Sequence, residues 1–328
     1  MGDVIIRTRE LQKSFTVKKE EVKAVAGVNL EVGAGEIFGF LGPNGAGKTT
    51  TLRMLATLLP IDGGEAMVAG FDVDKRPKEV RKRIGYVSQL GGADNEATGY
   101  EDLLLQGRLY GMSEKDARQR VDELAVTLQL DEFAHRKTKT YSGGQLRRLN
   151  VASGIVHRPD VLFLDEPTTG LDPQNRANLW VHLRELRDAG TTIFLTTHYL
   201  EEADVLSDRL AIMDNGKIVA EGTPRDLKAQ IAGDAIVVRP RTDVLDVDAV
   251  RSLLAEQPFV LDAHVEDDAV RLYVRDGAKA LPQLFAVLEG ARVVVEAVSL
   301  SQPSLDDVFL LQTGRSLRDA AQNLEVGQ

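Results

Sequence analysis

Short apolar runs, each followed by a polar or glycine-rich turn, recur through the first part of the chain. Ile37–Leu41, Ile84–Ser88, Val161–Leu164 and Thr191–Thr196 are continuous apolar or β-branched stretches. Such runs predict strands buried on both faces of a parallel sheet. Thr49–Leu59, by contrast, has the pattern of an amphipathic helix. Strands that alternate with helices in this way indicate an α/β fold.

The segment that follows the strand pattern at Ile84–Ser88 is predicted to be helical. Thr98 and Glu101 form a capping-box pattern, and Ser113 with Asp116 is a second helix start. Several apolar side chains lie between these two starts, and they are open to two interpretations, core packing or a docking groove for a partner. We expect core packing for most of this cluster: Leu103, Leu104, Leu105, Leu109 and Tyr110.

The pattern changes after Gly222. Thr223 and Pro224 are typical of a helix start, and Ser304 with Asp307 predicts a last helix near the end of the chain. Between them the order β-α-β-β-α-β matches a ferredoxin-like arrangement. The expected elements are Ala235–Arg239, Val247–Glu256, Val260–Glu266, Ala269–Arg275, Lys279–Leu288 and Arg292–Val298.

Composition narrows the functional classes. The 328 residues are enough for two domains, and the net charge of −10 argues against nucleic acid as the main partner. Residues 223–328 contain 11 Lys+Arg and 17 Asp+Glu, a net charge of 11 − 17 = −6. The absence of cysteine excludes disulfides and thiolate metal sites. We see neither an apolar signal segment nor a run long enough to span a membrane, and we therefore expect a cytoplasmic protein.

A phosphate-binding loop lies between the first buried strand and the helix that follows it. Residues 42–49 fit the pattern G-x-x-x-x-G-K-[ST] in its strand–loop–helix context. Backbone N–H groups of such a loop surround the phosphates, the lysine reaches the β- and γ-phosphates, and the threonine hydroxyl binds Mg²⁺. This loop is compatible with either ATP or GTP. The candidate nucleotide-binding residues here are Gly42, Pro43, Asn44, Gly45, Ala46, Gly47, Lys48, Thr49 and Thr50.

Polar side chains follow three other predicted strands. Asp165 and Glu166 come directly after Val161–Leu164, His198 follows Thr191–Thr196, and Gln89 follows Ile84–Ser88. Ligands bind at the carboxyl ends of parallel strands in open α/β sheets. We therefore expect Asp165, Thr49 and Gln89 to hold Mg²⁺ and Glu166 to activate a water for attack on the γ-phosphate. His198 is predicted to contact the γ-phosphate and that water.

The order of these motifs resembles the nucleotide-binding subunit of ATP-binding-cassette (ABC) transporters. The similarity covers about residues 4–222 and includes the P-loop, Gln89, "YSGGQ" at 141–145, "VLFLDE" at 161–166, "GLD" at 170–172 and His198. The family motif usually has leucine where this chain has Tyr141. The resemblance implies ATP as the nucleotide, with Phe15 stacked on the adenine at a position where tyrosine is commoner.

The resemblance also implies a site shared by two chains. Two copies pack head to tail in a homodimer, and the signature turn of one copy faces the γ-phosphate bound by the other. The residues implied to lie on this seam are Ser142, Gly143, Gly144, Gln145 and Asp172. Arg147 and Arg148, which follow the turn, are interpreted as a solvated or carboxylate-paired helix face.

The same resemblance implies where the domains of this chain begin and end and which role the chain has in transport. It implies an ATP-binding domain at 1–222 with a helical subdomain at about 90–158 that contacts a membrane permease, and an accessory or dimerisation domain at 223–328. The C-terminal "PSLDDVFL" and the overall length are similar to the daunorubicin-resistance type, a group of bacterial drug and lipid exporters. The expected location is the inner face of the bacterial cell membrane.

Three alternatives remain open. An ABC ATPase that acts on ribosomes or DNA is disfavoured because the chain has one P-loop, no heptad run and an acidic tail. An importer ATPase is disfavoured only by the C-terminal segment. A P-loop kinase or GTPase is disfavoured by "YSGGQ" and by the lack of a guanine-reading N-K-x-D.

Overall fold

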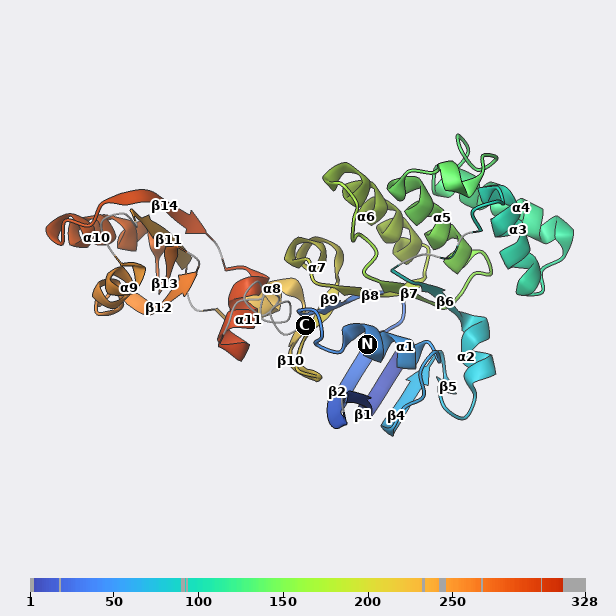
Figure 1. The fold of residues 1–328 in the computed structure, drawn as a ribbon, viewed down its shortest axis with the longest axis horizontal. Coiled ribbons are helices and arrows are strands. Elements are labelled where there is room, and N and C mark those ends of the chain that lie inside the picture. Colours follow the sequence, from blue (N-terminus) through green and yellow to red (C-terminus); the bar gives the residue numbers. More distant parts are fainter. Residues whose placement is uncertain are drawn as a thin grey trace. The chain divides into compact units, whose positions relative to one another are not determined.

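The computed structural model describes residues 3–17, 19–89, 92, 94–231, 234–241, 246–266, 268–301 and 303–314. Within this part of the chain, one compact unit runs to Pro224 and a second begins at Arg225 (Figure 1). The expected C-terminal domain extends to Gln328, and its residues 315–328 lie outside the described part. None of the described helices is both long enough and apolar enough to cross a bilayer.

The first unit contains two sheets. A six-stranded sheet has the order β10-β9-β3-β8-β7-β6, and a smaller antiparallel sheet has the order β2-β1-β4-β5. Its strands are β1 (Val4–Val17), β2 (Glu20–Gly33), β3 (Ile37–Leu41), β4 (Gly63–Val68), β5 (Phe71–Asp72), β6 (Ile84–Val87), β7 (Val161–Asp165), β8 (Thr192–Thr197), β9 (Arg209–Asp214) and β10 (Lys217–Gly222). Its helices are α1 (Lys48–Leu55), α2 (Pro77–Arg83), α3 (Gly99–Leu109), α4 (Glu114–Thr127), η1 (Thr138–Thr140), α5 (Gly143–Ile155), α6 (Pro173–Asp188) and α7 (Leu200–Leu206).

The six-stranded sheet is buried on both faces. Helix α1 lies between it and the antiparallel sheet, whereas α5, α6 and α7 cover the opposite face (Figure 1). Strand β7 shows why its sequence has no alternation: Val161 and Phe163 belong to the core on the α1 side. Leu162 and Leu164 belong to the core on the other side. The predicted α/β fold with buried parallel strands is therefore confirmed.

Two predictions within this unit were wrong. Helix α1 ends at Leu55 rather than at Leu59, because Thr57 has a φ of 61° and the amides of Leu58 and Leu59 both bond back to Arg53. The apolar cluster on α3 is also mostly outside the core. Leu103 is fully buried, but Leu105, Leu109 and Tyr110 are 56%, 71% and 44% exposed. Both helix starts were predicted correctly, because Thr98 caps α3 in a capping box and Ser113 caps α4.

The second unit has the predicted β-α-β-β-α-β order. Its antiparallel sheet, β12-β13-β11-β14, has the strand order of a ferredoxin-like fold. Val250 and Leu284, from its two long helices, are buried against sheet residues such as Leu272. The elements are α8 (Pro224–Ala229), which begins at the boundary, β11 (Asp234–Pro240), α9 (Val247–Ala255), β12 (Val260–Glu266), β13 (Ala269–Val274), α10 (Gly277–Gly290), β14 (Val295–Ser301) and α11 (Leu305–Thr313).

The last strand and helix of this unit show one error and one success. Strand β14 begins at Val295, not at Arg292, because a turn with Arg292 at a φ of 56° follows α10. Helix α11 begins at the predicted cap, Ser304, with Asp307 completing the capping box. The Asp307 carboxylate is almost fully buried, accepts a hydrogen bond from Tyr273 and lies 3.3 Å from the Arg271 guanidinium. One carboxylate thus anchors α11 to β13.

We expect Asp307→Ala to destabilise the second unit by about 2 kcal/mol, since it leaves the Tyr273 hydroxyl without its acceptor and removes one of the two carboxylates beside Arg271, which keeps Glu266. The measurement is hydrogen exchange of the β13 amides in the full chain, compared with Gln312→Ala at an exposed position of the same helix. Equal protection of β13 in the two variants would contradict this role for Asp307.

Candidate functional site

The candidate site lies at one edge of the six-stranded sheet. Strands β3, β8, β7 and β6 are neighbours in that order and run parallel. The P-loop follows β3, His198 follows β8, Asp165 and Glu166 end β7, and Gln89 follows β6. The strand order therefore brings together four segments that are up to 156 residues apart, 42 to 198. This is the edge at which the sequence placed them.

The P-loop is packed too closely for larger side chains at two of its glycines. A Cβ on Gly42 would lie 2.3 Å from the Met213 carbonyl oxygen, and one on Gly47 would lie 2.2 Å from the Ala24 carbonyl oxygen. Gly47 also has a φ of 106°, in the region that favours glycine. Pro43 and Ala46 are buried, Asn44 and Gly45 are exposed at the tip, and Thr49 and Thr50 are half-buried. The loop thus presents its tip and its first helical turn outward.

Lys48 is the first residue of α1 and is only 4% exposed. Its ammonium donates to the carbonyls of Gly42 and Pro43 at 2.7 and 3.0 Å and lies 3.8 Å from a Glu166 carboxylate oxygen. Burial lowers the pKa of Lys48 to about 8, against the opposing effects of Glu166 and Asp165. The charge is therefore held inside the curve of the loop, where a phosphate group would bind.

Asp165 connects the ends of three neighbouring strands. Its Oδ1 accepts hydrogen bonds from Thr49 Oγ1 and Thr196 Oγ1, both at 2.8 Å. The side chain is 2% exposed, so its charge is matched by these two hydroxyls rather than by solvent. A carboxylate beside a threonine hydroxyl is an oxygen pair of the kind that Mg²⁺ prefers. These residues fit the predicted metal site.

Glu166 adopts a strained backbone and is surrounded by polar groups. Its φ is 46°, and its amide donates to Thr196. One carboxylate oxygen lies 3.3 Å from His198 Nδ1, and the other accepts from Gln89 Nε2 at 3.3 Å. Thr169 Oγ1 donates to the same oxygen as Gln89 at 3.2 Å. The structure thus brings together Glu166, His198 and Gln89, three side chains that the sequence assigned to one site.

Electrostatics keep Glu166 ionised. Burial raises the pKa of this carboxyl, but the neighbouring His198 and the charge of Lys48 more than offset it, so the pKa lies below its ordinary value. A carboxylate that remains charged at neutral pH can accept a proton from a water molecule. Backbone strain at such a residue is typical of functional sites.

Phe15 lies on β1, apart from this edge. Its ring is 37% exposed, and the Lys13 ammonium lies 5.6 Å from the ring centroid. The exposed ring is available for stacking, as the resemblance implies.

The signature turn begins helix α5, on the opposite sheet face from α1 (Figure 1). Ser142 caps the helix, and its side chain and that of Gln145 form a capping box. Gly144 is required by packing, since a Cβ there would lie 2.4 Å from the Asn175 amide oxygen. Asn175 in turn bonds to Asp172, which caps α6. Ser142, Gly144 and Asp172 are therefore joined in one rigid corner, whereas Gly143 is exposed.

Tyr141 does more than replace a leucine. Its ring packs edge-on against Phe133 at a centroid distance of 4.8 Å, and its hydroxyl donates to the Phe133 carbonyl at 2.8 Å. The hydroxyl anchors the residue before the signature turn to the segment that follows α4.

The interpretation of Arg147 was wrong. Its guanidinium is buried and pairs with backbone carbonyls rather than with solvent or carboxylates. Sequence reasoning missed it, and also missed Thr196 and Thr169, which hold Asp165 and Glu166. The two threonines lie next to predicted site residues, so their positions were a usable signal. Arg147 gave no such signal, because an arginine on a helix is usually exposed.

Two of the family models that match the chain together cover most of its length. The family model "ABC transporter" matches residues 25–169. The model "ATP-binding protein DrrA1-3-like, C-terminal domain" matches residues 222–313. The first match spans the P-loop and the Asp165–Glu166 pair, and the second spans most of the second unit.

Curated relatives are similar over nearly the full length. The daunorubicin/doxorubicin resistance ATP-binding protein DrrA of Streptomyces peucetius is 45% identical over 97% of this chain and 98% of its own. The linearmycin resistance ATP-binding protein LnrL of Bacillus subtilis is 33% identical over 96% of this chain and 100% of its own. The Nod factor export ATP-binding protein I of Cupriavidus pinatubonensis is 38% identical over 96% of this chain and 92% of its own.

Solved structures match the first unit in extent. One is an ATP-binding cassette solved as a dimer in a post-hydrolysis state with ADP and Pi, with a TM-score of 0.62 and 25% identity over 66% of this chain and 98% of that one. Another is CbiO1 from Clostridium perfringens, part of an ABC transporter complex. It has a TM-score of 0.63 and 28% identity over 70% of this chain and 92% of that one.

We expect Glu166→Gln to bind ATP with near-normal affinity and to lose turnover by a factor of about 10² or more, because the amide cannot accept a proton. Calorimetric ATP binding and steady-state phosphate release measure the two effects. Thr169→Val, which removes one hydrogen bond to the same carboxylate, serves as the milder comparison. Brisk hydrolysis by Glu166→Gln would remove Glu166 from the role of base.

We also expect ATP affinity to fall as the pH rises through the pKa of Lys48, which is about 8. The phosphates favour the charged ammonium, so binding is at full strength below that pH, and the Kd rises about tenfold towards pH 9. Calorimetry with the unchanged chain and a non-hydrolysable ATP analogue measures this Kd, and it keeps Glu166, whose charge affects the pKa of Lys48. A thermal midpoint that stays constant across the range serves as the control, and a pH-independent Kd would contradict the prediction.

Proposed function

This chain belongs to the ABC transporter family as an ATP-hydrolysing, ATP-binding subunit, and on that premise we propose that it powers export of a drug-like or lipid-like compound through a separate membrane permease. One observation carries the proposal. The similarity to resistance and export proteins extends over 97% of the chain for DrrA and includes the C-terminal unit. An importer or a ribosome- or DNA-directed ATPase is not favoured by these relatives.

We infer that two copies of the chain form a head-to-tail pair with two ATP molecules between them. Lys48 and Ser142 begin helices on opposite faces of one sheet (Figure 1), so a γ-phosphate held by Lys48 meets the Ser142 turn of a second copy. The dimeric cassette among the matching structures supports this arrangement. Asp172, joined to the signature turn through Asn175, would lie on the same seam.

The chemistry we assign to the pair is hydrolysis of the γ-phosphoryl group. A water oxygen attacks the γ-phosphorus, its proton passes to Glu166, and the bond to the β–γ bridging oxygen breaks to give ADP and phosphate. Lys48 and the loop amides neutralise charge on the phosphates, and His198 contacts the γ-phosphate. Thr49, Asp165 and Gln89 would hold Mg²⁺, which would supply positive charge that offsets the charge of the phosphates.

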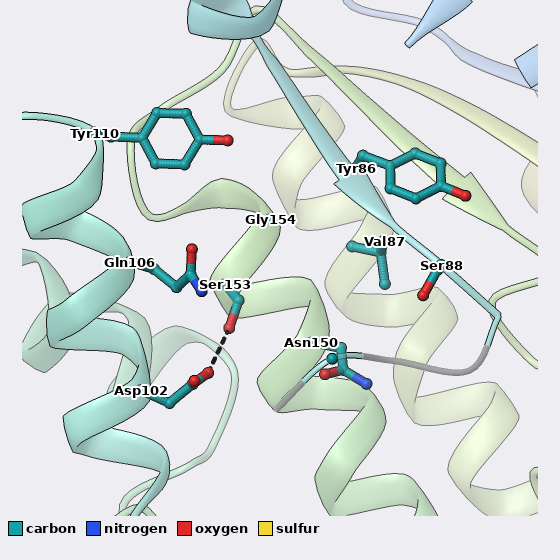
Figure 2. A pocket seen from close by; sticks show the side chains of 10 residues that line it. Tyr86, Val87, Ser88, Asp102, Gln106, Tyr110, Asn150, Ser153 and Gly154 are labelled. Carbon is teal, nitrogen blue, oxygen red and sulfur yellow. Dashed lines mark hydrogen bonds between the residues drawn. The ribbon is translucent and has the colours of Figure 1, made fainter. Parts of the chain in front are cut away.

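The permease is proposed to dock beside helix α3. A cavity of about 180 Å³ lies between α3, α5 and the end of β6, and Figure 2 shows Asp102, Gln106, Tyr110 and Ser153 around it. Burial raises the pKa of Asp102, whose carboxylate accepts from Ser153 at 3.3 Å. Leu105 and Leu109 do not line this cavity, but they add exposed apolar surface to the same helix. An apolar rim around a buried carboxylate suits an amphipathic segment of a partner.

The groove is also close to the catalytic loop. Val87 and Ser88 line it, and Gln89 follows them directly and donates to Glu166. Movement of a docked segment would therefore reach the site through a single short loop. We place the pair on the inner face of the membrane, where this groove meets the permease, and we assign the second unit an accessory or dimerisation role.

The docking proposal predicts that Leu109→Glu loses permease binding while the purified chain keeps its ATPase rate within about twofold, because a charge replaces an exposed apolar contact. Val126→Glu is the matched control, because Val126 is 70% exposed on the neighbouring helix α4 rather than on α3. Co-purification with the permease is the readout. Equal binding by the two variants would contradict docking at α3.

The export proposal itself is tested by capture from the host's detergent-solubilised membranes, with tagged Glu166→Gln and MgATP as bait. We expect a multi-span membrane protein whose recovery depends on ATP. Inverted membrane vesicles that contain both proteins then show in which direction the compound is transported. Recovery of ribosomal or DNA-associated proteins with no membrane partner would overturn it.

A further inference from the structure

Arg147 lies on helix α5, five residues after its cap Ser142. Its guanidinium contacts the loops that carry Gln89 and Glu166 rather than the signature turn. It is 6% exposed, and every hydrogen bond that its nitrogens donate within the described residues goes to a main-chain carbonyl. Nη1 donates to Ser88 at 2.8 Å, and Nη2 donates to Glu166 at 2.9 Å and to Asp165 at 3.2 Å. Nε donates to Pro167, and Nη1 also lies 3.5 Å from the Gln89 carbonyl.

These acceptors belong to the two loops that carry the proposed chemistry. Ser88 and Gln89 follow β6, whereas Asp165 ends β7 and Glu166 and Pro167 follow it. Each loop leaves a strand end with carbonyls that have no strand partner beyond that point, and a buried carbonyl needs a donor. A planar group with five N–H donors can meet carbonyls on both loops at once, whereas an ammonium group has only three donors on a single nitrogen.

The packing of α5 fixes where this guanidinium lies. Gly154, two helical turns after Arg147 and so on the same helix face, contacts β6 closely. A Cβ on Gly85 would lie 2.0 Å from the Gly154 carbonyl oxygen. This close approach presses the Arg147 face of α5 onto β6. The arginine side chain then extends along that face to the carboxyl ends of β6 and β7.

Charge balance supports a permanent cation here. Burial lowers the pKa of Arg147 to about 10, with Glu202 and Asp165 acting in the opposite direction. The group therefore remains charged at neutral pH. Charge-assisted bonds to neutral carbonyls are stronger than ordinary amide bonds, so the contact holds both loops firmly.

We propose that Arg147 is a positioning residue for hydrolysis: it fixes the Glu166 loop and the Gln89 loop to each other and to the helix that begins at the signature turn. The inference rests on the proposed function, because it takes Glu166 as the base and Ser142 as the contact to the other chain's ATP. It follows that engagement of Ser142 by that ATP is transmitted through α5 to the carboxylate of its own chain.

The test compares Arg147→Ala, Arg147→Lys and Arg148→Ala in the full chain. Arg148 is the matched control, because it lies on the same helix but donates to Leu128 and Gln129, outside the catalytic loops. We expect kcat to fall at least about tenfold in Arg147→Ala, with the KM for ATP within about threefold and an unchanged number of ATP sites per chain. Arg148→Ala should keep kcat within about twofold.

Two further readouts separate positioning from folding. Methylguanidinium added to Arg147→Ala should restore part of kcat, since the vacated space and the carbonyls remain, and it should not raise the rate of Glu166→Gln. If Arg147→Ala does not fold, Arg147→Lys takes its place: it keeps the charge but cannot span both loops, and its kcat should fall by a similar factor.

Three results decide the matter. A wild-type chain with no ATP turnover refutes the proposed function itself. An active wild type with an equally active Arg147→Ala refutes only the positioning role. A loss of kcat that merely parallels a loss of ATP sites, with no rescue by methylguanidinium, also refutes it and leaves Arg147 as a folding contact.

Discussion

The buried carboxylate of Asp165 organises the site. It accepts hydroxyl hydrogen bonds from Thr49, which begins α1 after β3, and from Thr196 at the end of β8. Three adjacent strand ends are thereby held at one position, and the P-loop and Glu166 lie on either side of it. A buried carboxylate is costly unless its oxygens are matched. The same arrangement that satisfies Asp165 provides the oxygen ligands and the fixed base that phosphoryl transfer requires.

The proposed two-chain ATP site also requires that this edge of the sheet remain open toward another molecule. Lys48 is on one sheet face and Ser142 on the other, and the signature turn is stiffened by its own capping box and by Asn175. We propose that this turn, on the opposite sheet face from its own P-loop, serves a second copy of the chain. We propose that the permease docks on the exposed side of α3, which lies beside the loop that carries Gln89. One chain thus joins two interfaces through a few residues.

The sequence was informative where chemistry and backbone geometry coincide. The strand ends, the P-loop and the capping boxes at Thr98 and Ser304 have residue requirements that are local, and the structure has them as predicted. Other features depend on the tertiary environment. Leu109 is exposed because no described element covers its side of helix α3. Arg147 is buried because Gly85 and Gly154 let α5 approach β6. Neither is visible in periodicity or composition.

The central claim is that each ATP site is built from two chains, and mixed dimers test it most directly. In a Glu166→Gln background, Lys48→Ala in one chain and Ser142→Arg in the other leave one intact site if the P-loop and signature turn act across the pair. Placing both changes in one chain beside an unchanged partner leaves none. We predict about one occluded ATP per dimer in the first pairing and none in the second. The reverse result, occlusion only when both changes share a chain, would show that each chain builds its own site.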